Sequence, residues 1–158
     1  MMENYFSGEY FNTLDEKGRI AFPARLRSIL SGDVIWITKG MGNDKSLLIY
    51  TPDEWKKTIE DLEKKLSIYQ ADTRWLYRRF ISPAREVVID KNGRIAIPQN
   101  LRDFANLKKD CVFLGMNSII ELWDVDTLNT EDEKASESGN NIFEELGKIQ
   151  NSSLKLNN

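Results

Sequence analysis

Two short segments of this sequence carry an aspartate, a glycine and an arginine at the same spacing. Residues 15–27 read DEKGRIAFPARLR and residues 90–102 read DKNGRIAIPQNLR, and 8 of the 13 aligned positions are identical. Glycine can adopt the positive φ that a tight turn needs, and an aspartate side chain can accept hydrogen bonds from the amides of that turn. The residues predicted to form two equivalent turns are Asp15 with Gly18, and Asp90 with Gly93.

The arginine that ends each turn, Arg19 or Arg94, suggests a role beyond the turn itself. A turn does not need arginine for its stability, whereas the planar guanidinium group fits phosphate oxygens and guanine edges. Each segment has a local charge of +2, from four basic and two acidic residues in the first copy and three and one in the second. We therefore expect both arginines to contact nucleic acid, with Lys17 and Lys91 adding phosphate contacts.

The composition excludes several classes of catalytic and metal site. The chain has 158 residues, no histidine and one cysteine. Ser-His-Asp triads, Cys-His pairs and zinc sites that contain histidine are therefore unavailable, and Cys111 alone can form neither a disulfide nor a metal cluster within one chain. We expect no catalytic residue, no cofactor and no metal. The disfavoured enzymatic alternative needs Asp15 and Asp90 as paired carboxylates in one pocket.

The net charge of −3 at first argues against a nucleic-acid partner, because nucleic-acid-binding domains usually have a basic excess. Residues 131–158 hold six acidic and three basic residues, however, so they account for the whole −3 and residues 1–130 are neutral. A neutral body with two basic loops is compatible with DNA binding. The sequence has no signal peptide and no long apolar stretch, so we expect a cytoplasmic protein without a membrane partner.

The repeated unit predicts the elements that position these residues. In each copy, alternating apolar residues after the glycine predict a short strand that ends at Pro23 or Pro98, and a short helix follows. Two copies indicate a pseudo-twofold pair rather than a solenoid. The predicted helices span residues 23–30 and 98–105, and the further predicted strands span residues 34–38, 47–50, 111–114 and 119–123.

A helical connector is predicted between the two copies. Thr51-Pro52-Asp53-Glu54 is typical of a helix start, with threonine as the cap. A second helix over residues 72–80 carries Arg74, Arg78 and Arg79, which we interpret as a solvated face or as partners of another subunit rather than as DNA contacts. The polar, acidic composition after residue 130 predicts a flexible segment.

With both copies of D-x-x-G-R-I-A-x-P-x-x-L-R in view, the chain resembles the MraZ proteins, bacterial members of the AbrB/SpoVT-like swapped-hairpin superfamily. The resemblance covers roughly residues 3–128 and includes Leu48 to Trp55, Ser82 to Val87 and Ile120 to Trp123. It implies an α+β fold in which two tandem AbrB-like swapped-hairpin half-barrel repeats form an intramolecular pseudo-dimer. The implied divisions are repeat 1 at 6–55, a helical connector at 56–81, repeat 2 at 82–128, and an acidic, flexible tail at 129–158.

The resemblance also implies a function. Members of the family assemble into rings and regulate transcription, mostly as repressors, of the division and cell-wall gene cluster, binding short direct repeats in its promoter. Carried onto this sequence, the DNA contacts fall at residues 15–19 and 90–94, and Arg27 and Arg102 match a second arginine of AbrB-like domains. The implied partners are double-stranded promoter DNA and further copies of the chain, with no small-molecule substrate, and the implied location is the nucleoid.

An alternative stays open at this point. The chain could be a protein-interaction or adaptor module of the AbrB-like superfamily, in the manner of an antitoxin. The apolar residues in the tail favour this alternative; they are Ile142, Phe143, Leu146 and Ile149. Removal of residues 131–158 would discriminate between the two functions.

Overall fold

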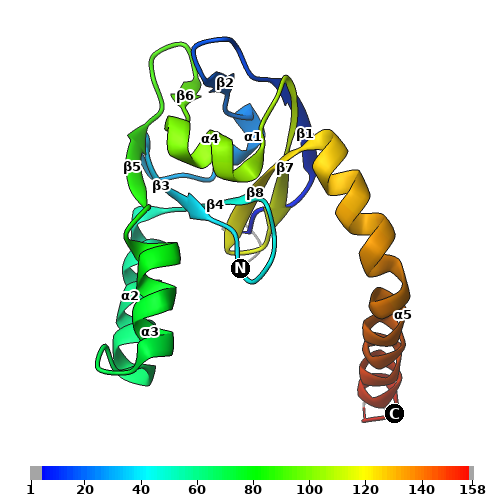
Figure 1. Ribbon diagram of the computed structural model, residues 1–158. Helices are drawn as coiled ribbons and strands as arrows, with labels where there is room; N and C mark the ends of the chain where they lie inside the picture. The colour runs from blue at the N-terminus through cyan, green and yellow to red at the C-terminus, as the bar shows by residue number, and fades with distance from the viewer. Residues whose placement is uncertain (1–4, 157–158) are drawn as a thin grey trace. The chain divides into compact units, whose positions relative to one another are not determined.

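The computed structural model describes residues 5–156, and at residues 137–141 and 153–156 it describes the backbone alone. The chain divides into two compact units, one that ends at Val125 and one that begins at Asp126. The first unit contains both repeated motifs and every strand of the described chain (Figure 1).

A six-stranded antiparallel sheet forms the centre of the first unit, with the strand order β1-β7-β8-β4-β3-β5. Two further short strands, β2 and β6, pair with each other in a separate sheet. The strands in chain order are β1 (Glu9–Thr13), β2 (Arg19–Ala21), β3 (Val34–Lys39), β4 (Leu47–Tyr50), β5 (Arg85–Val88), β6 (Arg94–Ala96), β7 (Asp110–Met116) and β8 (Ile119–Asp124).

The sheet order is symmetric about its centre, where β4 pairs with β8. The first strand of each repeat pairs with a strand of the other repeat: β1 lies against β7, and β5 lies against β3. In the small sheet Ile20 stands opposite Ile95, its equivalent in the second copy. This exchange of strands confirms the predicted α+β fold of two tandem swapped-hairpin repeats in one chain.

The helices of the first unit occur where the motif and the cap predict them. Each Pro that ends β2 or β6 leads into a short helix, and the Thr51 hydroxyl caps the connector by accepting a hydrogen bond from the Glu54 amide over 3.1 Å. The helices are α1 (Ala24–Arg27), α2 (Pro52–Lys65), α3 (Ala71–Leu76), a π-helical turn (Tyr77–Ile81) and α4 (Gln99–Ala105).

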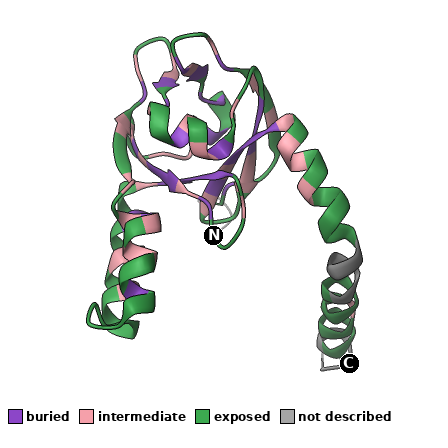
Figure 2. Ribbon diagram, viewed as in Figure 1, coloured by how far each residue is buried: buried purple, intermediate pink, exposed green. Residues whose placement is uncertain are grey.

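Buried residues lie along the strands of the first unit (Figure 2), and they form two apolar clusters, one on each face of the six-stranded sheet. Because successive side chains of a strand point to opposite faces, Leu47 and Ile49 of β4 join one apolar cluster and Leu48 and Tyr50 join another. The first cluster includes the buried residues of β2, β6, α1 and α4. The second includes Trp55 of α2, whose ring stacks on that of Trp36, with 5.6 Å between the centroids.

Residues 125–156 form a single helix, α5 (Val125–Leu156), where the sequence predicts a flexible tail. Glu, Lys and Ala, which are strong helix formers, are concentrated at residues 131–135, and Asp126 lies in the first turn, where the helix dipole favours a negative charge. The helix describes the backbone of this segment, and its expected flexibility stays a prediction. Within residues 5–156, neither α5 nor any other helix combines the length and the apolar character needed to cross a membrane.

Candidate nucleic-acid interface

The two predicted turns lie side by side, because the strands that follow them pair with each other. β2 and β6 run antiparallel, so that Arg19 stands opposite Ala96 and Arg94 opposite Ala21. The Phe22 amide donates a hydrogen bond to the Gly93 carbonyl, and the Ile97 amide donates one to the Gly18 carbonyl; both are 2.8 Å long. The two loops therefore form one continuous surface, seen at the top of Figure 1 beside β2 and β6.

Each aspartate holds its own turn closed, as the sequence predicts. Asp15 Oδ1 accepts hydrogen bonds from the Lys17 and Arg19 amides over 2.9 and 2.8 Å. Asp90 Oδ1 accepts equivalent bonds from the Asn92 and Arg94 amides over 2.8 and 3.0 Å. The glycine before each arginine has a positive φ, of 80° at Gly18 and 76° at Gly93, which explains why glycine occupies both positions.

These hydrogen bonds also determine the charge of the two aspartates. The backbone amide of Arg19 makes the largest contribution to lowering the pKa of Asp15, although desolvation opposes the shift. The amide of Arg94 does the same for Asp90, and the charge of Arg19 on the neighbouring loop lowers the pKa of Asp90 further. Both carboxylates are therefore ionised and serve the turns. Their side chains are 37% and 42% exposed, so they do not share the desolvated site that paired catalytic carboxylates would need.

Arg19 is anchored by a hydrogen bond through one side of its guanidinium group, whereas Arg94 forms only a longer ion pair and its buried Nε has no hydrogen-bond partner among the described residues. Arg19 Nε lies 2.8 Å from Asp15 Oδ2, and Arg94 Nε lies 3.7 Å from Asp90 Oδ2. Within the described part of the chain, the Nη groups of both arginines have no hydrogen-bond partner, and the side chains are 36% and 33% exposed. An anchored guanidinium with open Nη donors is suited to bind a phosphate or a base edge.

Arg27 and Arg102 each flank the loop of the other repeat. Arg102 lies so close to Gly18 that a Cβ there would come within 2.5 Å of its Cζ, and its Nε donates to the Ile97 carbonyl over 3.0 Å. Arg27 lies near Gly93, and its Nη2 forms an ion pair of 3.1 Å with Asp33. In the sequence, Arg27 and Arg102 each follow the turn of their own repeat. Because the repeats exchange strands, each arginine lies beside the turn of the other repeat in the structure.

The sequence analysis missed two lysines beside the first loop. Lys108 and Lys109, both exposed, line a cavity of about 490 Å³ together with Asp15 and Glu16, and the Lys109 carbonyl accepts a hydrogen bond from the Leu14 amide over 2.8 Å. The adjacent pair of lysines before an apolar run was a signal that could have suggested them. Lys17 and Lys91 are exposed at the tips of the two loops.

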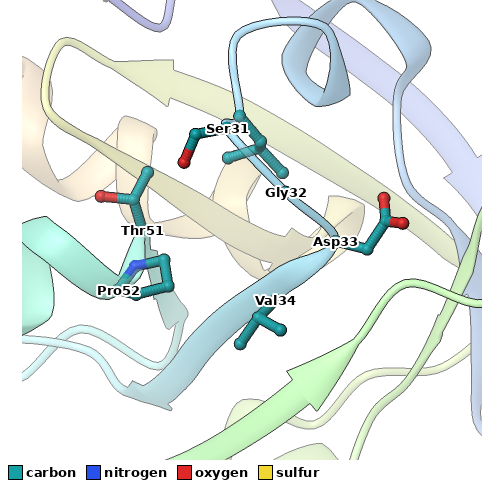
Figure 3. Close-up of a pocket in the computed structure, with 7 residues that line it drawn as sticks. Ser31, Gly32, Asp33, Val34, Thr51 and Pro52 are labelled. Carbon is teal, nitrogen blue, oxygen red and sulfur yellow. The ribbon is translucent and has the colours of Figure 1, made fainter.

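The equivalent position beside the second loop has a different charge. Here Gly32 and Asp33 stand where the first loop has Lys108 and Lys109, and the carbonyl of Asp33 accepts the hydrogen bond from the Ile89 amide, over 2.7 Å. Figure 3 shows this corner, where Ser31 and Gly32 border a cavity of about 80 Å³ with Thr51. The two loops are therefore alike in backbone but unlike in their surroundings. Within the described residues no cluster of acidic or cysteine side chains could hold a metal ion.

Comparison with known proteins assigns both halves of the chain to one family. The model of the family described as "MraZ protein, putative antitoxin-like" matches twice, at residues 5–79 and at residues 80–148. A relative from Treponema denticola, named "Transcriptional regulator MraZ", is 46% identical over 143 residues, which cover 90% of this chain and 98% of the relative. The two family matches agree with the two swapped repeats of the structure.

Proposed function

The chain belongs to the MraZ family, and from this we propose that it is a sequence-specific DNA-binding repressor that contacts promoter direct repeats through its two Asp-x-x-Gly-Arg loops. The observation that carries the proposal is the pairing of β2 with β6, which joins both loops into one surface. That surface presents two arginines with open Nη groups, although the turns alone would not need an arginine for their stability.

Each residue of the surface has a distinct role in this proposal. Arg19 and Arg94 contact bases or phosphates, and the exposed Lys17 and Lys91 contact phosphates. Arg27 and Arg102, which flank the loops, support them and add positive charge. The aspartates and glycines shape the turns and do not contact DNA.

The proposal includes a target, a location and an assembly. The regulated genes are the division and cell-wall cluster, and the protein acts in the cytoplasm on the nucleoid, as a non-enzymatic protein without a cofactor. One chain offers a small contact of two loops, so useful affinity requires several copies on adjacent repeats. We therefore include a homo-oligomer, a closed ring, in the proposed function.

The proposal is tested by replacing both loop arginines in the full chain. The Arg19→Ala/Arg94→Ala variant is expected to bind its own upstream DNA at least about 30-fold more weakly, because each lost bidentate contact costs about 1–3 kcal/mol. Fluorescence anisotropy with labelled promoter DNA measures the affinity, and random DNA measures the specificity.

A matched control is Arg78→Ala/Arg85→Ala, which removes the same charge from exposed positions outside the loops. This control should retain almost all of the affinity. If the two double variants bind promoter DNA equally well, the loops are not the DNA-binding site.

A second candidate function is an adaptor that binds another protein through α5. Four apolar side chains of this helix are exposed, among them Ile142 at 73% and Phe143 at 74%. A chain without residues 131–158 that still represses its promoter but no longer retains a protein partner would favour the adaptor. If repression is lost in the Arg19→Ala/Arg94→Ala variant but kept in the chain without residues 131–158, the DNA-binding function is favoured.

A further inference from the structure

The two loops have equivalent backbones, but one position beside them differs in the sign of its charge. Just beyond the end of β1, the Leu14 amide donates a hydrogen bond to the Lys109 carbonyl over 2.8 Å. Just beyond the end of β5, the Ile89 amide donates the matching bond to the Asp33 carbonyl over 2.7 Å. A basic residue beside the first loop therefore occupies the position that an acidic residue occupies beside the second.

Beside the second loop, the flanking arginine is neutralised. Arg27 Nη2 donates a hydrogen bond to Asp33 Oδ1 over 3.1 Å, and the two side chains form an ion pair. In Figure 3 the Asp33 side chain points away from Thr51. A phosphate that approached Arg27 would have to compete with the Asp33 carboxylate, so this corner has little net attraction for an anion.

Beside the first loop, the equivalent arginine keeps its full charge. Arg102 Nε donates a hydrogen bond to the Ile97 carbonyl over 3.0 Å, which is a neutral partner. Among the residues that the structure describes, Arg102 forms no ion pair. Its guanidinium group lies directly against the turn at Gly18. A half-buried guanidinium without an acidic partner, placed beside an exposed loop, is suited to bind an anion.

Two lysines extend this positive charge along the same side of the first loop. The backbone holds both of them in place, because the Lys108 amide donates a hydrogen bond to Asp124 Oδ1 over 3.1 Å and the Lys109 carbonyl accepts the bond from Leu14. Both side chains are exposed, and both residues line the cavity of about 490 Å³ beside the loop. We call Arg102, Lys108 and Lys109 the first-loop cluster.

The difference in charge remains when the loops themselves are counted. Residues 15–19 contain two acidic and two basic residues, and residues 90–94 contain one acidic and two basic residues. With its cluster the first loop therefore has a net charge of +3, whereas the second loop with Arg27 and Asp33 has a net charge of +1. The first loop has the stronger attraction for a polyanion.

We propose that the first-loop cluster binds DNA phosphates, so that the first loop holds the DNA backbone more strongly than the second. The inference rests on the proposed function and deepens it by assigning residues to the phosphate contacts. DNA is the source of the phosphates, because the cluster adjoins a loop of the proposed DNA-binding surface. Contacts to phosphates carry no sequence information, so the cluster adds affinity while Arg19 and Arg94 read the sequence.

The test measures how DNA affinity depends on salt in the full chain. Lys108→Ala/Lys109→Ala should weaken binding to promoter DNA at least about tenfold at about 0.1 M salt, and should make the slope of log K against log salt shallower by about 2, because each phosphate contact contributes about 0.9. The affinity for random DNA should fall by the same factor. Fluorescence anisotropy at several salt concentrations measures both affinities.

Lys64→Ala/Lys65→Ala is the matched control, because it removes two adjacent, exposed lysines near the end of α2. This control should keep the wild-type affinity and the wild-type slope. Thermal unfolding of both double variants shows that each is folded, since all four side chains are exposed and none belongs to the core.

The two flanking arginines provide an internal comparison. Arg102→Ala should make the slope shallower by about 1, whereas Arg27→Ala should leave it unchanged, because Asp33 already neutralises Arg27. Asp33→Asn releases Arg27 and should make the slope steeper by about 1, but not in a chain that also carries Arg27→Ala. The double variant separates the release of Arg27 from the general effect of removing one acidic residue.

The inference is overturned if Lys108→Ala/Lys109→Ala keeps the wild-type slope, if the Lys64/Lys65 control changes the slope as much, or if only promoter binding weakens. It is also overturned if Arg27→Ala and Arg102→Ala change the slope equally. A wild-type slope in the Lys108/Lys109 variant, together with lost promoter binding in the Arg19/Arg94 variant, removes this inference and leaves the proposed function. Equal wild-type affinity for promoter and random DNA removes the sequence-specific function instead, and the effect of the cluster on the slope is still measured.

Discussion

At the scale of single residues, the two loop glycines are equivalent in backbone but not in surroundings. Gly18→Ala and Gly93→Ala should each cost about 1–2 kcal/mol of unfolding free energy, because both residues have a positive φ. The new Cβ at Gly18 would also meet the Arg102 guanidinium at 2.5 Å, whereas at Gly93 the nearest atom is 3.4 Å away. We therefore predict similar losses of stability but a larger loss of DNA affinity for Gly18→Ala.

Urea denaturation and anisotropy measurements on the same samples check this prediction. Gly42→Ala serves as the control, since its φ of 58° carries the backbone strain with no atom within 4 Å of the added Cβ. Equal DNA affinities for the Gly18 and Gly93 variants would show that displacement of Arg102 has no effect on binding.

The aspartates of the turns predict how stability depends on pH. Hydrogen bonds lower the pKa of Asp15 and Asp90 in the folded protein, so their ionised forms favour folding. This contribution is fully present above the unfolded pKa of about 3.9 and is lost as the pH falls through the lower folded value. In Asp15→Asn/Asp90→Asn, the melting temperature should be lower at pH 7 and should fall less steeply below about pH 4.

Thermal unfolding between pH 2 and pH 7 measures both effects. Asp61→Asn, on the exposed side of α2, makes the same kind of charge change away from the turns and should keep the wild-type slope in acid. If the melting temperature of the double variant fell as steeply below pH 4 as that of the wild type, the role of the two carboxylates would be contradicted.

At the scale of elements, the local pattern predicts most of the fold and fails where pairing is non-local. The motif and its offset of 75 indicate β2, β6, α1 and α4, and the apolar runs indicate four strands of the large sheet. The edge strands β1 and β5 are missed, because no residue of EYFNT or REVV is fully buried, so neither segment has the apolar run that marks β4. They become strands only because β7 and β3 of the other repeat pair with them.

The same reason limits what the sequence can say about the candidate site. Asp15, Gly18 and Arg19 act within one turn, so their arrangement follows from local spacing. The positions of Arg102 beside Gly18, and of Lys108 and Lys109 beside the first loop, depend on the exchange between repeats. An alignment of the two copies shows which residues are equivalent, but it does not show which copy each one contacts.

At the scale of the whole molecule, a symmetric backbone carries asymmetric side chains. The sheet order and the β2–β6 register are symmetric, whereas two lysines flank one loop and Gly32 and Asp33 flank the other. In the proposed function, the symmetric scaffold lets both loops contact one DNA, and the asymmetric side chains give the two loops different surroundings. Both properties suit a protein that binds direct repeats, which have a direction.

The distribution of charge gives a prediction for the whole chain. Removal of residues 131–158 changes the net charge from −3 to 0 and leaves every strand in place. The shortened chain should bind promoter DNA more tightly at about 20–50 mM salt, because long-range repulsion between an acidic tail and DNA is lost. The gain should vanish near 0.3 M salt, where the Debye length is well under 10 Å.

Anisotropy titrations across salt concentrations measure this effect. The slope of log K against log salt should stay the same, because the proposed phosphate contacts lie in the loops and not in the removed segment. Glu131→Gln/Asp132→Asn/Glu133→Gln is the matched control, since it makes the same charge change of +3 while keeping α5. If repulsion is the cause, this variant and the shortened chain should gain equally at low salt. Weaker binding by the shortened chain alone would mean that α5 itself takes part in DNA binding or assembly.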